Sequence, residues 1–416
     1  MQAAFPEPTG LTRPACAERI GLARLTKMAA TGIDLRPLWR ELIDKLIGGT
    51  IEAGEWLDLS LIAQLLGDKP AGLAIQHEIL AFHRLFRSPC AVQNPRLRVL
   101  ALAAATDIGG NTPIEFLLED SAIELMTLYV IPEAEWPDPL PDHDIAIVVA
   151  SDSEDCRDAL AIIRAIPNWP RPLLNPPHLI GSLDRDKLHD LLMGIEGLAI
   201  PATAAASRER LTDLARSAAA PCDIAADLAF PVIVRPRGSH AGAGLAKIDD
   251  PAAMRRYLGA RQEQEFFVSR FVDYAGRDGL FRKCRIVVVD GRPYACHLAI
   301  ADRWDIWYLN AGMSLSVSKR IEEETFMRTF DVGFAQRHRA ALAGMIDRIG
   351  LDYFTVDCAE TSDGSLLIFE VDNTAIVHNM DPPALFPYKG PQMRKVFDAF
   401  ATMLDRRVAR TEEKAA

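Results

Sequence analysis

The stretch FPVIVRPRGSHAGAGL, residues 230–245, joins an apolar run to a loop that is rich in glycine. The apolar run is typical of a buried strand, and Arg235 and Arg237 come directly after it. A glycine loop lets backbone N–H groups approach an anion closely, and neighbouring cations complement its charge. The pattern therefore indicates a polyphosphate site, with the alternative that the glycines serve only as a turn.

The glycine loop differs from two common nucleotide-binding motifs. A Walker loop needs GxxxxGK followed by Ser or Thr at the start of a helix, and the stretch lacks this order. The stretch also lacks GxGxxG, which disfavours a dinucleotide site.

Acidic residues gather in a second region, far along the chain. Asp357 lies in FTVDCAE, and Glu370 lies in LLIFEVDN, which also contains Asp372 and Asn373. Their apolar neighbours predict largely buried strands, where an uncompensated carboxylate is costly and a bound cation is a common remedy. Oxygen ligands in small number are typical of Mg²⁺. We therefore expect a magnesium site, with salt-bridged acids as the alternative.

Composition narrows the class of protein. The chain has 416 residues, of which 49% are hydrophobic and 25% charged, as is ordinary for folded domains. A formal charge of -11 argues against a nucleic-acid surface. We expect no membrane association, because no apolar run approaches the roughly 20 residues of a membrane span. The seven cysteines are scattered without a CxxC pair, which predicts a cytoplasmic protein without a disulfide framework.

Changes in apolar periodicity predict several domains of α/β and α+β class. Leu38, Leu42 and Leu46 share one helical face, which indicates a helical region suited to packing or to a homodimer. Strand-like runs flank PIEFLLEDS, which is expected to be helical. Strands that alternate with a helix indicate a parallel α/β sheet. Asp-Gly turns between later strands indicate antiparallel hairpins. The expected bounds are 1–31 for a flexible arm, 32–94 for the helical domain, 95–178 for the parallel domain, 179–265 and 266–403 for two α+β subdomains, and 404–416 for a tail.

The turn at residues 107–112 precedes PIEFLLEDS and is expected to open its helix. Free N–H groups at a helix start favour a carboxylate. We therefore expect part of a substrate site at this turn, with the candidate contacts Asp107, Gly109, Gly110 and Asn111.

Several landmarks together resemble the ATP-grasp ligases, a superfamily that includes D-alanine–D-alanine ligase, glutathione synthetase and enzymes that add glutamate to a ribosomal protein. The resemblance implies an ATP-grasp fold in residues 179–403, preceded by a substrate domain. The landmarks in chain order are NPPHLI at 175–180, DRDKL at 184–188, IPAT at 200–203, PVIVRPRGSHAG at 231–242, FFVSRFV at 266–272, and Asp357 followed by EVDN at 370–373.

The resemblance implies a role for individual residues. Lys187 and Arg235 would contact phosphate, with Arg235 standing where relatives carry a lysine, and Arg285 would contact the transferred phosphate or the acyl group. Lys283 replaces an acid that commonly binds ribose, which leaves Asp273 or Asp278 for that role. The loop over the phosphates would comprise Gly238, Ser239, His240, Ala241 and Gly242, and the strand holding adenine would contribute Ser269, Phe271 and Val272.

The same resemblance implies an ATP-dependent carboxylate–amine ligase that uses Mg²⁺. A carboxylate attacks the γ-phosphorus of ATP to give an acyl phosphate, and an amine then displaces phosphate. The substrates would be small molecules, with a peptide acceptor as an open alternative. Residues 301–324 would form a lid, and His297 and Trp304 would line the substrate cavity, with His378 as a further contact. Two alternatives remain, a small-molecule kinase on the same scaffold and a non-catalytic nucleotide-binding protein.

Overall fold

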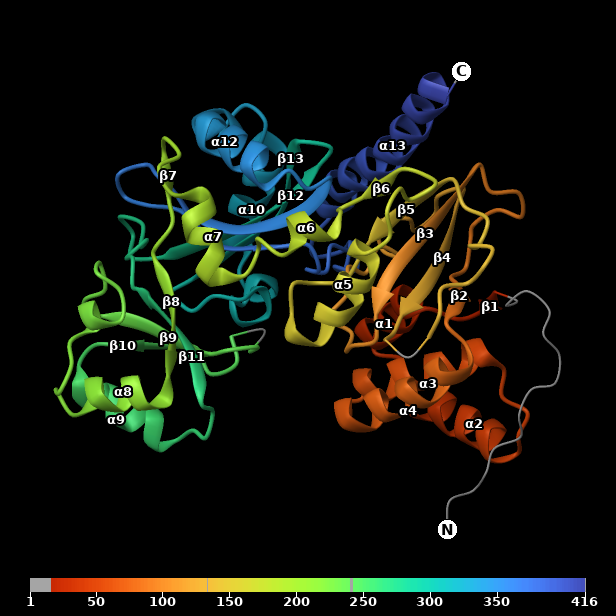
Figure 1. Cartoon of the computed structure of the whole chain (residues 1–416). Helices are drawn as coiled ribbons and strands as arrows, with labels where there is room; N and C mark the ends of the chain where they lie inside the picture. The colour runs from red at the N-terminus through yellow and green to blue at the C-terminus, as the bar shows by residue number, and fades with distance from the viewer. Residues whose placement is uncertain (1–15, 133, 240–241, 416) are drawn as a thin grey trace, which may run out of the picture. The chain divides into compact units, whose positions relative to one another are not determined.

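The computed structural model describes residues 16–132, 134–239 and 242–415 (Figure 1). The chain forms two compact units, each of which is described by itself. Unit 1 comprises Met1–Ala150, Asp158–Leu173 and Arg407–Ala416, and unit 2 comprises Ser151–Arg157 and Leu174–Arg406.

Helices of unit 1 pack around a small apolar core. The core contains Leu25, Leu42, Leu59 and Ile62, all of which are almost fully buried. Their spacing along amphipathic segments explains the helices, since one apolar stripe of each helix faces this core. The helices are α1 (Leu22–Ala30), α2 (Arg36–Ile47), α3 (Ala53–Leu65) and α4 (Lys69–Phe82), and the helical prediction for this region is confirmed.

A six-stranded sheet of order β1-β2-β4-β3-β5-β6 completes the regular structure of unit 1. β3 pairs in parallel with both β4 and β5, so the predicted parallel sheet is confirmed at its centre. β2 instead pairs with β4 antiparallel. The strands are β1 (Ala17–Glu18), β2 (Leu85–Arg87), β3 (Leu97–Ala104), β4 (Ile123–Val130), β5 (Ile145–Val148) and β6 (Leu173–Leu174).

Two expectations for unit 1 are corrected. The predicted flexible arm is wrong for residues 17–30, which form β1 and α1. Asp58 fixes this segment, since its carboxylate accepts hydrogen bonds from the backbone N–H groups of Ile20 and Gly21. PIEFLLEDS forms a succession of turns instead of a helix, so the turn at 107–112 opens no helix.

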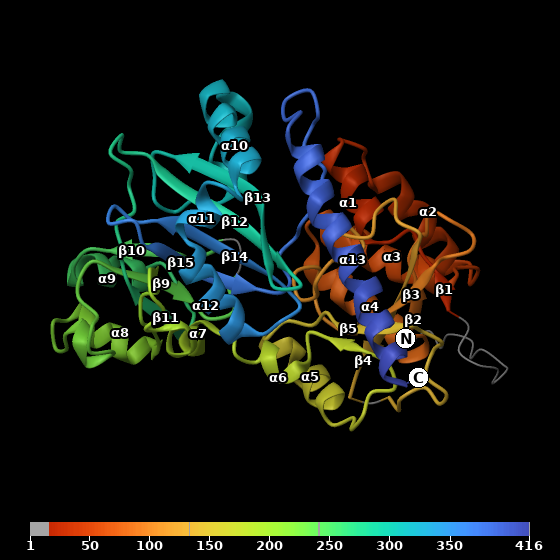
Figure 2. The same cartoon turned by 90° about the horizontal axis from the view of Figure 1, so that it is seen from above.

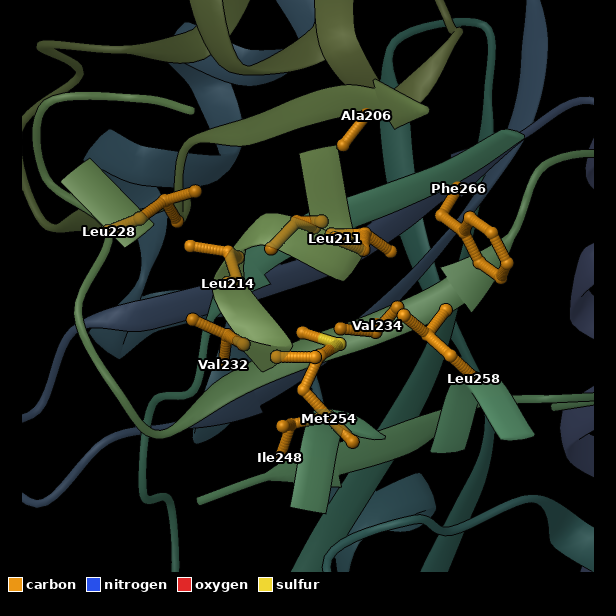
Figure 3. Close-up of a cluster of buried hydrophobic side chains, with 12 residues drawn as sticks. Ala206, Leu211, Leu214, Leu228, Val232, Val234, Ile248, Met254, Leu258 and Phe266 are labelled. Atoms are coloured by element: carbon orange, nitrogen blue, oxygen red, sulfur yellow. The ribbon is translucent and has the colours of Figure 1, made fainter. Parts of the chain in front are cut away.

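A four-stranded antiparallel sheet of order β10-β9-β11-β8 lies in unit 2. In β9, Val232 and Val234 are fully buried against α8 and α9, as Figure 3 shows. Strand alternation therefore turns Arg235 toward the opposite face of the sheet. The elements are β8 (Thr203–Ser207), α8 (Arg208–Ala215), β9 (Val232–Pro236), β10 (Ala246–Ile248), α9 (Pro251–Gly259) and β11 (Glu265–Arg270).

A five-stranded sheet of order β13-β12-β14-β15-β7 forms the other sheet of unit 2 (Figure 2). Asp290 and Gly291 both have positive φ in the tight turn between β12 and β13, which confirms the predicted hairpin. The strands are β7 (Leu198–Ala199), β12 (Phe281–Val289), β13 (Arg292–Ala301), β14 (Tyr353–Glu360) and β15 (Leu366–Asp372). The helices are α5 (Arg157–Arg164), which is shared with unit 1, α6 (Pro177–Ile180), α7 (Arg185–Leu192), α10 (Val317–Thr329), α11 (Phe334–Arg337), α12 (Arg339–Ile349) and α13 (Lys389–Ala415).

The expected bounds of the two α+β subdomains shift. β7 pairs with β15, and α7 packs against α12, so both elements belong with the five-stranded sheet. β11 pairs with β8 and β9, so it belongs with the four-stranded sheet. The expected tail at 404–416 is wrong, because α13 continues as one helix to Ala415. Within the described residues, every helix is too short or too polar to cross a membrane.

Candidate active site

The side chain of Arg235 leaves β9 on the face away from its core. Its guanidinium donates hydrogen bonds to the hydroxyl oxygen and the carbonyl oxygen of Ser239. Burial and the neighbouring charge of Arg185 lower the pKa of Arg235 to about 10, and attraction to Glu370 acts in the opposite direction. Arg235 thus braces the start of the glycine loop while facing a carboxylate from the other sheet.

Asp357 lies in the centre of the five-stranded sheet and is held by two cations. Its Oδ1 accepts from Nε of Arg285 at 2.7 Å, and its Oδ2 accepts from a second guanidinium nitrogen at 3.0 Å. Nζ of Lys283 lies 2.8 Å from the same Oδ2. Burial alone would raise the pKa of Asp357, but Arg285 and Lys283 lower it far below its ordinary value. The carboxylate is therefore ionised at any physiological pH.

Glu370 of β15 forms an ion pair with Arg185 of α7. A second guanidinium nitrogen of Arg185 lies 3.4 Å from the carbonyl oxygen of Phe369. Burial raises the pKa of Glu370, yet the charges of Arg185, Arg235 and Lys283 lower it overall. The charges of Arg235 and Glu370 act on each other's pKa, and the expected approach of Arg235 to the acidic hairpin stays a prediction.

Arg185 is a site residue that the sequence did not reveal. DRDKL directs attention to Lys187, but Nζ of Lys187 donates to the carbonyl oxygen of Gly181 and lies 3.6 Å from Asp152. Arg185 precedes Lys187 by two positions and instead reaches Glu370. The signal available in the sequence was that Arg185 is a second cation in the first turn of the helix that carries Lys187. The phosphate role of Lys187 stays a prediction.

The expected magnesium ligands do not form a metal site in this arrangement. Carboxylate and amide oxygens are the donors that Mg²⁺ prefers. In residues 16–132, 134–239 and 242–415, however, no group of three or more Asp, Glu, His and Cys side chains is arranged to hold a metal ion. Asp357 and Glu370 are engaged by protein cations.

Asp372 and Asn373, the other two expected metal ligands, follow at the end of β15. Oδ1 of Asp372 accepts from the backbone N–H and the hydroxyl of Thr374 at 2.6 and 2.8 Å. Burial, followed by repulsion from Glu370, raises the pKa of Asp372. Asn373 is almost fully buried. These contacts make the end of β15 a rigid, polar turn beside Glu370.

The expected phosphate loop is described only in part. Gly238 and Gly242 have φ of 72° and 74°, a region that favours glycine. Among the described residues outside the loop's own neighbours, nothing lies within 4 Å of a Cβ added at either position, so this part of the loop is open. His240 and Ala241 lie outside the described residues.

The strand expected to hold adenine packs against the expected lid. Phe271 meets the ring of Trp304 edge to face, with centroids 5.8 Å apart. Trp304 and Val272 pack against the buried cluster of Tyr274, Ala359 and Leu367. This places Trp304 near the adenine strand, and its substrate role stays a prediction.

The other residues expected to bind adenine and ribose have their own contacts. Ser269 pairs in register with Thr203 and Ile233, which leaves it inside the four-stranded sheet. Asp273 accepts from the N–H of Ala275, and Asp278 pairs with Arg282. Both carboxylates are thus engaged by residues close to them in sequence, and the choice between Asp273 and Asp278 as the ribose contact stays a prediction.

A second polar group surrounds His297. His297 is the register partner of Arg285, and its ring lies 4.7 Å from the ring of Tyr308. Its Nδ1 is buried without a hydrogen-bond partner among the described residues. Burial, and to a smaller extent the positive charge of Arg285, lowers the pKa of His297 well below the ordinary value. Nζ of Lys389 lies over the Tyr308 ring at 4.0 Å and 3.0 Å from Asp381. The neighbourhood can receive a polar substrate group.

His378 belongs to this neighbourhood. Burial lowers the pKa of His378, while the charge of Asp381 raises it and those of Lys389 and Arg285 lower it. The charges of Lys389 and Arg285 act on the pKa of both His297 and His378, and the substrate role of the two histidines stays a prediction.

The expected substrate turn belongs to unit 1. Asp107 forms an ion pair with Lys69, and its Oδ1 accepts from the N–H of Gly109 at 3.0 Å. The side-chain amide of Asn111 bonds both backbone groups of Ala104. A Cβ at Gly110 would lie 2.3 Å from the methyl group of Thr106. These contacts account for the turn structurally, and its role in substrate binding stays a prediction.

The two sheets of unit 2 thus define a cation-rich site of the kind that binds phosphate. No protein-family model matches the chain, and neither does any curated protein sequence. Among solved structures, the chain is similar to a RimK domain ATP-grasp protein from Sphaerobacter thermophilus, at 19% identity and a TM-score of 0.41, over 75% of this chain and 99% of that one.

Two structures of complexes with ATP have similarly low sequence identities and similar TM-scores. D-alanine–D-alanine ligase from Bacillus anthracis, complexed with ATP, is 12% identical with a TM-score of 0.45, over 76% of this chain and 99% of that one. Carboxyaminoimidazole ribonucleotide synthase from Aspergillus clavatus, complexed with ATP, is 11% identical with a TM-score of 0.43, over 74% and 78% of the two chains. The likeness is to proteins of the class that the sequence landmarks indicate, and it assigns no substrate or residue role to this chain.

Proposed function

We propose that this chain is an ATP-dependent ligase of the ATP-grasp class that joins a carboxylate to an amine. The proposal is supported chiefly by one observation, the grouping of four cations around two carboxylates, of which Asp357 is buried and Glu370 is partly exposed. Arg185 and Arg235 face Glu370, while Lys283 and Arg285 hold Asp357. Four cations exceed the charge of these acids, which leaves a net positive site suited to a polyphosphate.

The protein contributes charge and position in this reaction. A substrate carboxylate oxygen attacks the γ-phosphorus of ATP, the bond to the β-bridging oxygen breaks, and ADP leaves. Negative charge gathers on phosphoryl oxygens, where the guanidinium groups of Arg185 and Arg235 are already in place to stabilise it. Such groups cost no reorganisation when the charge develops, because their contacts to Glu370 and Ser239 hold them beforehand.

The second step needs an acyl phosphate that water does not reach. An amine attacks the acyl carbon, the carbon–oxygen bond to phosphate breaks, and the amine loses a proton. The segment from Trp304 to Tyr308 supplies a cover, since it packs on Phe271 and on His297. No protein nucleophile enters either step.

The experiment measures ADP and phosphate release by the purified protein over a panel of amino acids, singly and in pairs. The wild type is expected to release ADP with at least one pair, and Arg235→Met is expected to lower the rate at least tenfold, because a charge-assisted contact to phosphate is worth about 1.5–3 kcal/mol. Arg256→Met, at an exposed position of α9, is the matched control and should retain the wild-type rate.

The product of the reaction distinguishes a ligase from a kinase. An amide product with both substrates present supports the ligase. A phosphorylated product that persists when amines are added identifies a kinase, and equal background rates for wild type and Arg235→Met with every pair contradict catalysis at this site.

A further inference from the structure

Lys283 and Arg285 surround the carboxylate that was expected to bind a metal ion. Oδ1 of Asp357 accepts one hydrogen bond, and Oδ2 is shared by Arg285 at 3.0 Å and Lys283 at 2.8 Å. The side chain of Asp357 is only 6% exposed, compared with 19% for Lys283 and 24% for Arg285. The carboxylate is thus covered, and its two cations form the boundary with solvent.

The backbone fixes this arrangement. Lys283 and Arg285 are two residues apart on β12, so strand alternation directs both toward one face of the sheet. β12 pairs with β14 such that Arg285 stands directly opposite Asp357. The three charges are therefore set by register and do not depend on flexible loops.

A divalent ion at Asp357 would meet two positive charges that are already bound. Both oxygens already accept from these cations, so the ion would have to share the carboxylate with them or displace Lys283 or Arg285 from a largely buried contact. Displacement leaves a cation without its partner in a region of low dielectric constant, which is costly. Repulsion between the ion and the remaining cation adds to this cost.

We propose that Lys283 and Arg285 act in place of a metal ion at Asp357, so that fixed protein cations hold the phosphates of ATP there. The inference rests on the proposed function, because it presumes that this site receives a nucleotide. Lys283 is the decisive residue, since it adds the second positive charge and has no other ion pair among the described residues. Removing its charge leaves Oδ2 of Asp357 with one cation instead of two, which lowers the cost of binding a metal ion there.

The test measures ATP affinity by calorimetry, in EDTA and then with increasing Mg²⁺, for the wild type and Lys283→Met. The wild type is expected to bind ATP in EDTA with an affinity within about tenfold of that in Mg²⁺. Lys283→Met is expected to lose roughly 10- to 100-fold in EDTA and to recover much of this loss as Mg²⁺ is added. Lys395→Met, at an exposed position of α13, serves as the control and should follow the wild type.

A second measurement counts bound Mn²⁺ by electron paramagnetic resonance in the presence of ATP. Lys283→Met should bind one more Mn²⁺ than the wild type, because Asp357 then keeps only one of its two cations. The count does not require turnover. It also separates a change in the metal site from a general loss of folding, which would lower the number of ions.

The outcomes separate the inference from the proposed function. ATP binding by the wild type only with Mg²⁺, together with equal Mn²⁺ counts for wild type and Lys283→Met, overturns the role of Lys283 and leaves the nucleotide site standing. No ATP binding under any condition overturns both. Retained binding in EDTA together with an added Mn²⁺ ion in the variant supports the inference.

Discussion

Arg185 and Lys187 show how two neighbouring cations on one helix acquire different roles. Both lie in the first turn of α7, but Arg185 forms an ion pair with Glu370 whereas Lys187 points to Gly181 and Asp152. The planar guanidinium can contact a carboxylate and a phosphate together through its separate N–H groups, which an ammonium does less well. Under the proposed function, we therefore expect Arg185 to be the phosphate contact on this helix.

Exchanging each residue for methionine separates these roles. Arg185→Met should weaken ATP binding roughly 10- to 100-fold, because a charge-assisted hydrogen bond to phosphate is lost. Lys187→Met should change the affinity less than threefold, since Lys187 is half exposed and engaged elsewhere. The measurement is fluorescence titration with an ATP analogue at fixed salt. A larger effect at Lys187 than at Arg185 would favour the assignment made from DRDKL.

Glu360 supplies a pH-dependent contribution to stability in unit 2. Nε2 of His338 lies 3.1 Å from Glu360, and this contact together with those to Arg337 outweighs burial and lowers the pKa of Glu360 to about 2. A carboxyl whose pKa is lower in the folded chain than in the unfolded chain stabilises the fold above the unfolded value. This contribution is lost as the pH falls from about 4.5 toward 2.

Thermal unfolding of the wild type and of Glu360→Gln between pH 7 and pH 3 checks this sign. The variant should melt at a lower temperature at pH 7, and the difference between the two proteins should narrow as the pH falls below about 4.5. A difference that stays constant over this range would show that the charge of Glu360 contributes nothing.

At the scale of elements, α10 is fixed to the start of α13 by a buried ion pair. Nζ of Lys389 lies 3.4 Å from Glu323, and both side chains are at least 96% buried. Glu323 also accepts from the hydroxyl of Tyr388 at 2.6 Å and from the N–H of Leu298 at 3.1 Å. This network ties the end of the expected lid to β13.

Removing one charge of the Lys389–Glu323 pair should lower the free energy of unfolding more than removing both. Lys389→Met should lower the free energy of unfolding by about 3–5 kcal/mol, because Glu323 is left buried without its cation. The double variant Lys389→Met with Glu323→Gln should regain part of this loss. Urea unfolding followed by circular dichroism measures the difference, and a double variant that is less stable than the single one would contradict the explanation.

Regular apolar patterns were the part of the fold that the sequence predicted best. The apolar run in FPVIVRP predicted β9 and its charged end, and Asp290-Gly291 predicted the β12–β13 turn. PIEFLLEDS has an apolar spacing compatible with a helix, yet it forms turns in which Ile114 and Phe116 are buried. Tertiary packing overrode local propensity there, which periodicity alone cannot reveal.

The prediction of a flexible N-terminal arm failed for a different reason. Pro6, Pro8 and Pro14 suggested a loose arm, but residues 17–30 are ordered through contacts distant in sequence. Arg19 pairs with Glu115, and Asp58 binds the backbone at Ile20. Contacts of this kind leave no local pattern in the sequence.

At the scale of the molecule, the residues of the candidate active site come from separate parts of unit 2. The sequence indicated that Arg235, Arg285, Asp357 and Glu370 act together. In the structure Arg285 is paired with Asp357, and the charges of Arg235 and Asp357 both act on Glu370. The sequence did not indicate Arg185, nor that Lys283 binds Asp357. The Lys283–Asp357 pair depends on the register of β12 against β14, and the Arg185–Glu370 pair depends on where α7 packs; a single sequence determines neither.

The central claim is that Arg185 and Arg235 bind the triphosphate of ATP beside Glu370. A crystal structure with a non-hydrolysable ATP analogue tests it most directly. We predict phosphate oxygens within hydrogen-bond distance of both guanidinium groups, with adenine near Phe271. An analogue bound elsewhere in the chain, with Arg185 and Arg235 free of phosphate, would contradict the account.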